Sequence, residues 1–161
     1  MNGNAAFAVP KDRQRVMVHL DKGVALEGEI FLEFFSHEQS AHQKVTSFLE
    51  NDSVFFPLKV SATGATEFVN RKNIGIVEVD TAGEPDPEYF SFQILHTIPV
   101  TVILRHGDAI SGLLMAEVPQ DKARLSDCLN LPDRFLSVKT AGKIYYINKT
   151  AVQKVLHADK R

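Results

Sequence analysis

The sequence predicts an all-β protein made of two copies of one five-stranded unit, with at most short helical turns. Residues 18–30 align with residues 102–114 without a gap, and apolar residues, a turn glycine and a mid-strand glycine fall at matching places. Short apolar runs alternate with turn residues in both segments, whereas long helical periodicity is almost absent. Together these observations favour an all-β chain with an internal repeat.

The repeat continues beyond this first hairpin. Two further blocks match in the same order, and the second copy is a few residues shorter in polar, turn-like sequence where length changes are tolerated. Two ordinary hairpins with a common pattern would explain one match, but three matches in order favour a tandem duplication. The first of these blocks matches 45–50 and 55–58 with 125–130 and 135–138, and the second matches 68–77 with 146–155.

Four glycines have expected structural roles. Gly23 and Gly107 follow polar residues between two strands, where a tight hairpin needs the positive φ that glycine adopts readily. Gly28 and Gly112 lie inside the return strands among apolar neighbours, a position that usually marks a bulge or a sharp bend. A small barrel needs such a bend where one strand serves both of its sheets.

The chain divides into five segments by composition. Within the first unit, residues 45–49 have strand character, and in the second unit residues 121–131 fit a short helix or a buried loop. Residues 89–95 are expected to form an extra strand that caps an exposed sheet edge. The segments are a flexible arm (1–14), a first unit (15–79), an acidic, proline-containing linker with the extra strand (80–98), a second unit (99–157) and a tail (158–161).

Length and charge limit the kind of protein this can be. The 161 residues carry a formal net charge of -2 and a pI near 6.3, so no strong field attracts nucleic acid or an anionic membrane. Units of about 65 residues are near the lower size limit for an independent core, so we expect them to pack on each other or on further copies. Cys128 is the only cysteine, which excludes an intrachain disulfide and fits a reducing cytosol. Because no signal peptide or membrane-spanning run is evident, the sequence predicts a cytoplasmic protein without a membrane partner.

The motifs also carry a family resemblance. The second copy reads Val-x-Leu-x-x-Gly-x-x-Ile-x-Gly-x-Leu over residues 102–114, and this hairpin resembles the first motif of the Sm-like superfamily. Residues 146–155 are similar to its closing motif, particularly that of the bacterial RNA chaperone in this superfamily. The Sm-like fold is a strongly bent, five-stranded, SH3-like barrel. The resemblance therefore implies two tandem Sm-like (SH3-like) barrels packed on each other.

The turns before the last strand of each unit hold the candidate contacts to RNA or to a partner. In the RNA-binding versions of the closing motif, Lys-His or Arg-Gly stands here, whereas this chain has Lys-Thr in the second copy. RNA contact would run mostly through phosphate, with nearby aromatic rings available for stacking. In a chain of net negative charge, the simpler interpretation is that these cations keep strand edges soluble. The candidates are Asn70, Arg71, Lys72, Asn148, Lys149 and Thr150.

No pattern in the sequence indicates an enzyme. Cys128 lies in an apolar-spaced segment without a histidine nearby in sequence, as expected of a small buried hydrophobe. His37 and His42 lack the cysteine or carboxylate company of a metal site, and no phosphate loop or hydrolase signature occurs. We therefore expect no cofactor and no metal. The sequence favours a non-catalytic binding or scaffold protein with an unknown protein partner and with self-association through edge strands; RNA binding is the alternative.

Overall fold

The computed structural model describes residues 11–33, 40–81, 95–119, 121 and 124–158. These residues form ten antiparallel β-strands and two α-helices, so the all-β prediction is confirmed. The first half contains β1 (Lys11–Leu20), β2 (Ala25–Glu33), α1 (Ala41–Leu49), β3 (Phe55–Val60), β4 (Thr66–Asn70) and β5 (Ile74–Asp80). The second half contains β6 (His96–Leu104), β7 (Ala109–Ala116), α2 (Leu125–Leu129), β8 (Phe135–Lys139), β9 (Lys143–Asn148) and β10 (Val152–His157).

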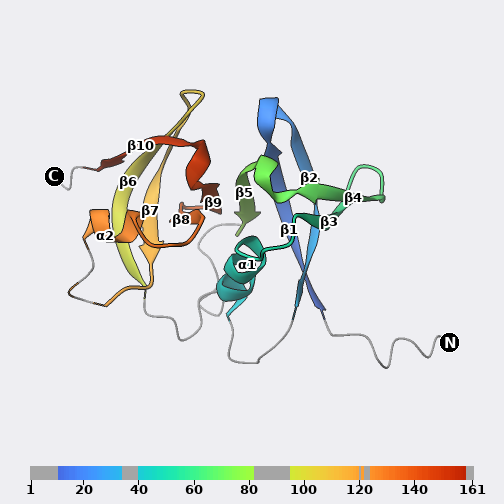
Figure 1. Ribbon diagram of the computed structural model, residues 1–161, viewed down its shortest axis with the longest axis horizontal. Coiled ribbons are helices and arrows are strands. Elements are labelled where there is room, and N and C mark those ends of the chain that lie inside the picture. Colours follow the sequence, from blue (N-terminus) through green and yellow to red (C-terminus); the bar gives the residue numbers. More distant parts are fainter. Residues whose placement is uncertain (1–10, 34–39, 82–94, 120, 122–123, 159–161) are drawn as a thin grey trace.

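All ten strands belong to one continuous sheet, and its strand order repeats. The order is β10-β6-β7-β8-β9-β5-β1-β2-β3-β4. Each half thus places its last strand beside its first, followed by its second, third and fourth. The halves join where β5 pairs with β9, whose residues run from Ile76 opposite Ile147 to Asp80 opposite Lys143. Figure 1 shows this junction in the middle of the molecule, with β4 and β10 at opposite ends.

The structure does not confirm the two tandem barrels, packed on each other, that the sequence predicted, because the sheet is not closed. The sheet does not close within either half, because neither β4 with β5 nor β9 with β10 pairs among the residues described. Instead, the pairing of β5 with β9 fuses the two five-stranded sets into one open sheet. The expected boundaries also shift. β1 begins at Lys11, inside the predicted arm, and β6 begins at His96, inside the predicted linker. Most of the extra strand expected at 89–95 lies outside the described residues.

Helix α1 replaces a strand that the sequence suggested. Ser40 caps it with a complete capping box: its hydroxyl accepts from the Gln43 N–H at 3.1 Å, and the Gln43 side chain accepts from the Ser40 N–H at 2.9 Å. Val45 and Leu49, four residues apart, are both buried. The strand prediction for 45–49 was wrong because its apolar spacing also suits one helical face. By contrast, α2 is the short helix that was one of the two alternatives for 121–131.

The four glycines serve two different purposes. Gly23 and Gly107 have φ values of 78° and 103°, in the left-handed region that their hairpins require. Gly28 and Gly112 instead allow a neighbouring strand to come close. A Cβ atom at Gly28 would lie 2.4 Å from the Lys59 carbonyl oxygen, and one at Gly112 would lie 2.5 Å from the Lys139 carbonyl oxygen. These contacts are where β2 meets β3 and β7 meets β8.

Substituting Gly112 by alanine is expected to lower the free energy of unfolding by about 1 to 3 kcal/mol, the usual cost of overpacking. The new methyl group would overlap a backbone oxygen, which cannot move without disturbing the pairing of β7 with β8. Gly142→Ala is the matched control, because nothing lies within 4 Å of a Cβ at that position. Urea unfolding of both variants measures the difference. Equal stabilities would show that the close approach is not a constraint.

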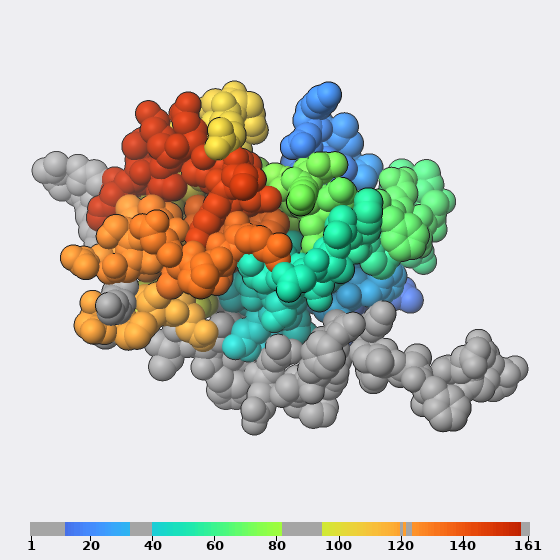
Figure 2. Space-filling model, in the orientation of Figure 1, coloured from blue at the N-terminus to red at the C-terminus, as the bar shows by residue number. Residues whose placement is uncertain are grey.

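Two apolar cores lie along the sheet, and the first is built by both halves. The core of the first half includes Met115, Ile144 and Tyr146 from the second half, and Tyr146 is completely buried there. The buried residues of the second core, among them Cys128 and Ile147, all belong to the second half, and Ile76 of the first half packs against them. Figure 2 shows the blue-to-green and the yellow-to-red halves in contact across the middle of the molecule. Neither helix of the described chain has the length and apolarity needed to cross a membrane.

Candidate functional site

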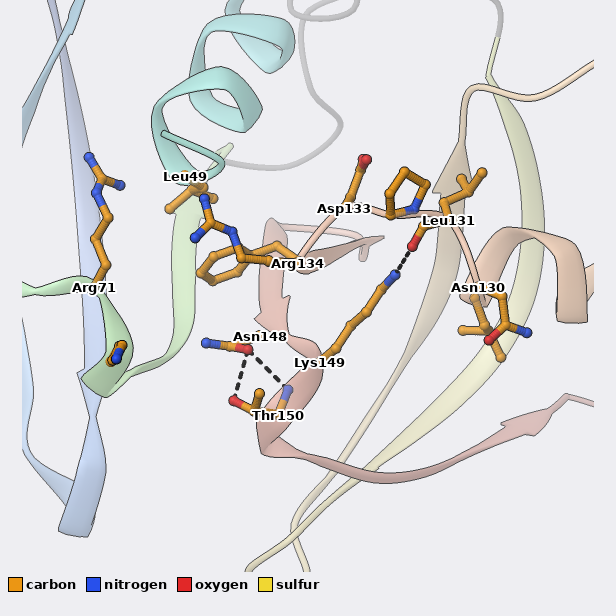
Figure 3. A pocket seen from close by; sticks show the side chains of 13 residues that line it. Leu49, Arg71, Asn130, Leu131, Asp133, Arg134, Asn148, Lys149 and Thr150 are labelled. Atoms are coloured by element: carbon orange, nitrogen blue, oxygen red, sulfur yellow. Dashed lines mark hydrogen bonds between the residues drawn. The ribbon is translucent and has the colours of Figure 1, made fainter. Parts of the chain in front are cut away.

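A groove of about 780 Å³ lies between the two halves and gathers most of the candidate contacts. Its walls come from the end of α1, the turn after β4, the loop before β8 and the turn after β9 (Figure 3). The last two belong to the second half, so both halves, which are joined where β5 pairs with β9, form the groove. The lining residues are Leu49, Arg71, Lys72, Leu129, Asn130, Leu131, Pro132, Asp133, Arg134, Phe135, Asn148, Lys149 and Thr150.

The two closing turns have the same construction. Each is a single 3-10 turn preceded by an asparagine, whose side-chain oxygen accepts a hydrogen bond from the backbone two residues later. Asn70 accepts from the Lys72 N–H, and Asn148 accepts from the Thr150 N–H, both at 3.0 Å. The second turn is also tied to the first half, because the Asn148 amide donates to the Ile74 carbonyl at 2.9 Å. Of the six predicted contact residues, five line the groove and Asn70 does not.

Lys149 crosses the groove rather than pointing into solvent. Its Nζ donates to the Leu131 carbonyl oxygen at 2.5 Å, as Figure 3 shows. Removal from water lowers the pKa of Lys149, although Asp133 and Glu50 act in the opposite direction. The ammonium group therefore already has one protein acceptor, and its burial disfavours the charged form.

Arg71 is held beneath the end of α1. Its Nη1 donates to the Phe48 carbonyl at 2.6 Å, its Nε donates to Ser53 Oγ at 3.2 Å, and its guanidinium carbon lies 4.8 Å from the centre of the Phe48 ring. Burial lowers the pKa of Arg71, and the positive charge of Arg134 lowers it further. Arg71 thus anchors the helix to the turn after β4, whereas the Lys72 side chain has no polar partner within the described part of the chain.

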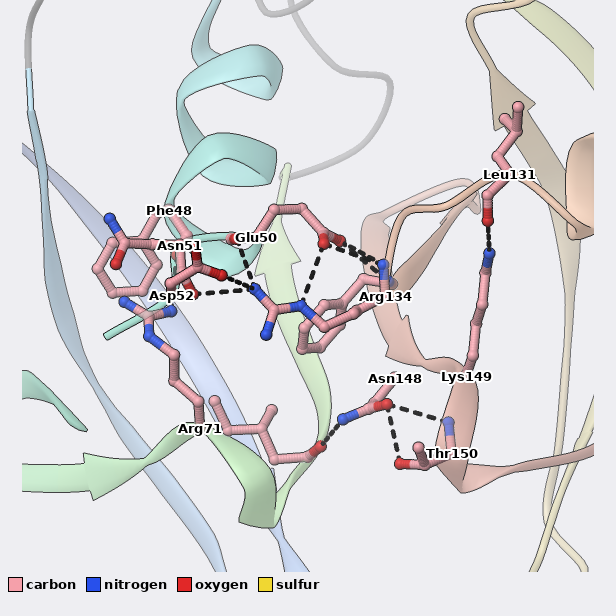
Figure 4. Close-up of polar contacts among 12 residues, drawn as sticks. Phe48, Glu50, Asn51, Asp52, Arg71, Leu131, Arg134, Asn148, Lys149 and Thr150 are labelled. Carbon is pink, nitrogen blue, oxygen red and sulfur yellow. Dashed lines mark hydrogen bonds and ion pairs between the residues drawn. The ribbon is translucent and has the colours of Figure 1, made fainter. Parts of the chain in front are cut away.

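Arg134 and Glu50 form a clasp that the sequence did not reveal. The Glu50 carboxylate accepts from the Arg134 backbone N–H at 2.8 Å and from the Phe135 backbone N–H at 3.0 Å. In return, the Arg134 side chain donates to the carbonyls of Glu50 at 2.5 Å and Asn51 at 3.0 Å (Figure 4). The partners are 84 residues apart, so no local pattern announces the contact. The only hint is that a charged residue at 134 stands where the first copy has Val54.

Replacing Glu50 by alanine is expected to cost about 2 kcal/mol of stability, because two backbone N–H groups would lose a charged acceptor at the same time. Glu29→Ala is the matched control. The Glu29 and Glu50 side chains are similarly exposed, at 31% and 29%, but Glu29 forms a single ion pair with Arg13 at 3.9 Å. Such a surface pair is worth about 0 to 1 kcal/mol. Chemical denaturation at neutral pH separates the two variants, and equal losses would contradict the role of the clasp.

A second groove of about 910 Å³ lies between the β1–β2 and β6–β7 hairpins. Glu78 stands in it and binds both His19 and the Nζ of Lys143, the latter at 2.7 Å. Burial by itself raises the pKa of Glu78, but the hydrogen bonds from Lys143 and His19 outweigh it and hold that pKa below its usual range. This ion-paired group ties β5 to β9 on the outer side of the junction.

The cysteine and histidines that the sequence raised as possible catalytic or metal-binding residues are Cys128, His37 and His42. Cys128 is buried in the second core, and burial raises the pKa of its thiol, so the reactive thiolate is disfavoured. His42 is buried against Tyr146, while His37 lies outside the described residues. No group of three or more His, Cys, Asp or Glu side chains within the described segments is placed to hold a metal ion. No family model, curated protein or solved structure matches this chain.

Proposed function

We propose that this chain is a non-catalytic cytoplasmic binding or scaffold protein that works through protein contacts, including contacts between its own copies. In this proposal the two halves are a tandem duplication of one Sm-like (SH3-like) unit. The repeated strand order and the two equivalent asparagine-capped turns support the duplication. The proposed ligand is another protein surface rather than a small substrate.

One observation carries the proposal: large apolar side chains are exposed together at the outer edge of the first half. Val54 is 58%, Phe55 54% and Phe68 69% exposed. Phe55 lies opposite Asn70, and Pro57 lies opposite Phe68, so Phe55 and Phe68 sit on the neighbouring strands β3 and β4, and Val54 directly precedes β3. An aromatic cluster that is left in water favours a contact with a further apolar surface.

The test compares the proteins retained by the wild-type chain with those retained by a Phe55→Ser/Phe68→Ser variant, using extract of the source cells. Val24→Ser is the matched control, because Val24 is also exposed, at 48%, but lies in the β1–β2 turn. We expect the double variant to lose the bound proteins and the control to keep them. Identical sets from all three chains would reject the proposal.

RNA binding is the second candidate, and the groove between the halves favours it. Four cationic residues line that groove (Arg71, Lys72, Arg134 and Lys149), and the pKa of Arg71 is lowered first by burial and then by Arg134. A phosphate would relieve this repulsion. Against it, the Arg71, Arg134 and Lys149 head groups already have protein acceptors.

Filter binding of single-stranded RNA at increasing salt decides on this candidate. If four phosphates are neutralised, affinity falls roughly 50-fold between 50 and 200 mM salt. Lys149→Ala and Arg71→Ala would each weaken binding, whereas Lys59→Ala, on the exposed face of β3, serves as the control. Absence of binding at low salt, or binding that neither variant changes, rejects RNA recognition by this groove.

A further inference from the structure

We propose that the second groove, between the β1–β2 and β6–β7 hairpins, binds a small organic acid, a ligand with one carboxylate and an apolar body. This binding site is separate from the exposed aromatic cluster of the proposed function, so either can hold without the other. The groove volume of about 910 Å³ lies within the usual range for small-molecule sites. Figure 2 shows the surface hollowed between the blue β1–β2 hairpin and the yellow β6–β7 hairpin.

Strand β5 forms the floor of this groove, between the two hairpins (Figure 1). Its lining positions run from Ile74 to Glu78, which at a rise of roughly 3.3 Å per residue span about 13 Å. That length suits a short acyl chain better than a long peptide. Apolar side chains from both halves line the groove and would shield such a chain from water. They are Leu20, Ile74, Ile76, Leu104, Ile110 and Tyr145.

Gly75 lies at a β-bulge in this floor, and the same bulge occurs in the second half. Between β1 and β5 the register shifts at Gly75, which has no partner on β1. Between β6 and β10 the register shifts in the same way at Gln153. Gly75 and Gln153 also occupy matching positions of the two aligned segments, 68–77 and 146–155. Because the bulge accepts glutamine in one half, its backbone does not require glycine in the other.

The packing around Gly75 does not demand a missing side chain either. Its φ lies outside the left-handed region, unlike those of the turn glycines. A Cβ atom at Gly75 would lie 3.7 Å from the His19 carbonyl oxygen and 3.8 Å from the Ala151 Cβ, which are ordinary contact distances. Both of these neighbours line the groove. Glycine weakens a strand, and a common reason to keep it there is the close approach of a ligand.

The cations of the groove come from three different turns. Lys22 follows β1, Lys72 follows β4 and Arg105 follows β6, and all three residues are exposed. Arg105 donates to the Thr150 carbonyl at 2.5 Å, whereas the two lysine side chains have no polar partner within the described segments. Their charges are therefore available to a ligand that enters from solvent.

Three carboxylates also line the groove, and they leave one positive charge in surplus when the histidines are neutral. Lys143 neutralises Glu78 at 2.7 Å, so only Asp21 and Asp108 remain to balance the three cations. One surplus charge suits a carboxylate, whereas a phosphate monoester would bring a charge of about -1.5 to -2. Because salt screens exposed charges, this surplus selects the sign of the ligand more than it adds affinity.

Titration of the isotope-labelled full chain with sodium octanoate, followed through the NMR shifts of the backbone amides, tests the site. We expect shifts at Gly75 and at the groove-lining residues of both hairpins. The dissociation constant should be on the order of 1 mM, as the efficiency of ligands with about ten heavy atoms allows. Shifts confined to the β3–β4 edge around Phe55 and Phe68 would overturn the inference. The same holds if no saturable shift occurs up to about 10 mM.

Two substitutions of Gly75 test whether the ligand needs the open floor. Gly75→Gln introduces the residue of the equivalent bulge and should weaken octanoate binding roughly tenfold, because its side chain occupies the space of the ligand. Gly75→Ala should weaken binding by a smaller factor and leave the free energy of unfolding unchanged or slightly raised. It decides the question if the larger residue prevents folding. Gln153→Gly, the reverse change, is the matched control. Wild-type affinity in the folded Gly75 variants would overturn the inference.

Octanol, which has the same chain without the carboxylate, tests the selection for an acid. A Lys22→Asn/Lys72→Gln variant should bind octanoate roughly threefold more weakly at low salt and octanol as the wild type does. Asparagine is chosen because Lys22 has a φ of 63°, which asparagine tolerates. Lys59→Gln, on the exposed face of β3, is the control. An equal change for both ligands, or none for octanoate, would overturn the assignment to an organic acid.

Discussion

Replacing Tyr146 by alanine is expected to lower the free energy of unfolding by about 3 to 5 kcal/mol, the cost of removing a large buried aromatic side chain. Among the described residues, Tyr146 is the largest completely buried side chain, and it packs in the core of the first half although it belongs to the second. Its hydroxyl also bonds Nδ1 of His42 at 2.8 Å, and the two rings are stacked with centroids 5.6 Å apart. The loss therefore combines a cavity with a broken buried hydrogen bond.

Phe68→Ala is the matched control for this prediction, because Phe68 occupies the same position in the first half but is 69% exposed. Measured in urea at low protein concentration, where copies do not associate, it should change stability by less than about 1 kcal/mol. Similar losses for the two substitutions would contradict the view that Tyr146 joins the halves through a shared core. A cooperative single transition in the wild type would agree with that view.

Acidification is expected to destabilise the protein through His42 by up to about 3 kcal/mol between pH 6.5 and pH 4. Burial lowers the pKa of His42 from its ordinary value of 6.5 to about 4. In this interval the unfolded chain binds a proton at His42 that the folded chain does not bind. The contribution of His42 to stability is therefore fully present above pH 6.5 and is lost as the pH drops toward 4. The neutral ring lies on α1 beside Tyr146, at the contact between the halves.

His42→Gln is the variant that tests this, because an amide can still bond the Tyr146 hydroxyl but does not titrate. Its unfolding free energy is compared with that of the wild type at several pH values from 7 to 4. The difference between the two curves isolates the contribution of His42, because every other residue is the same in both chains. We expect this difference to shift by about 1.4 kcal/mol per pH unit in favour of the variant. Parallel curves would show that folding does not lower the pKa of His42, and would contradict the prediction.

The repeat in the sequence anticipated much of the local structure. The hairpins at Gly23 and Gly107 have the positive φ that the sequence predicted for their turns. The turns that the sequence placed before the last strand of each unit are present, and an asparagine caps each of them. Periodicity and turn chemistry act within a few residues, which is why a single sequence is enough to recognise them.

The errors occur where distant residues decide the outcome. Residues 45–49 are helical because Ser40 and Gln43 cap α1 and because the helix packs against β2 and Tyr146. The candidate groove is lined by residues from both halves of the chain, which are far apart in the sequence. The sequence pointed to Arg71, Lys72 and Lys149 but not to Arg134 or Glu50, whose contact spans 84 residues.

By itself, the sequence determined the all-β class and the glycine turns, because each follows from side-chain chemistry over short distances. Only the tertiary structure decided that the copies share one open sheet. The pairing of β5 with β9 is made by backbone groups, which do not depend on the identity of the side chains. This pairing also places Tyr146 in the core of the opposite half. Any strand edge offers the same N–H and C=O groups, so the choice between closing a barrel and joining a neighbour is made by the packing around it.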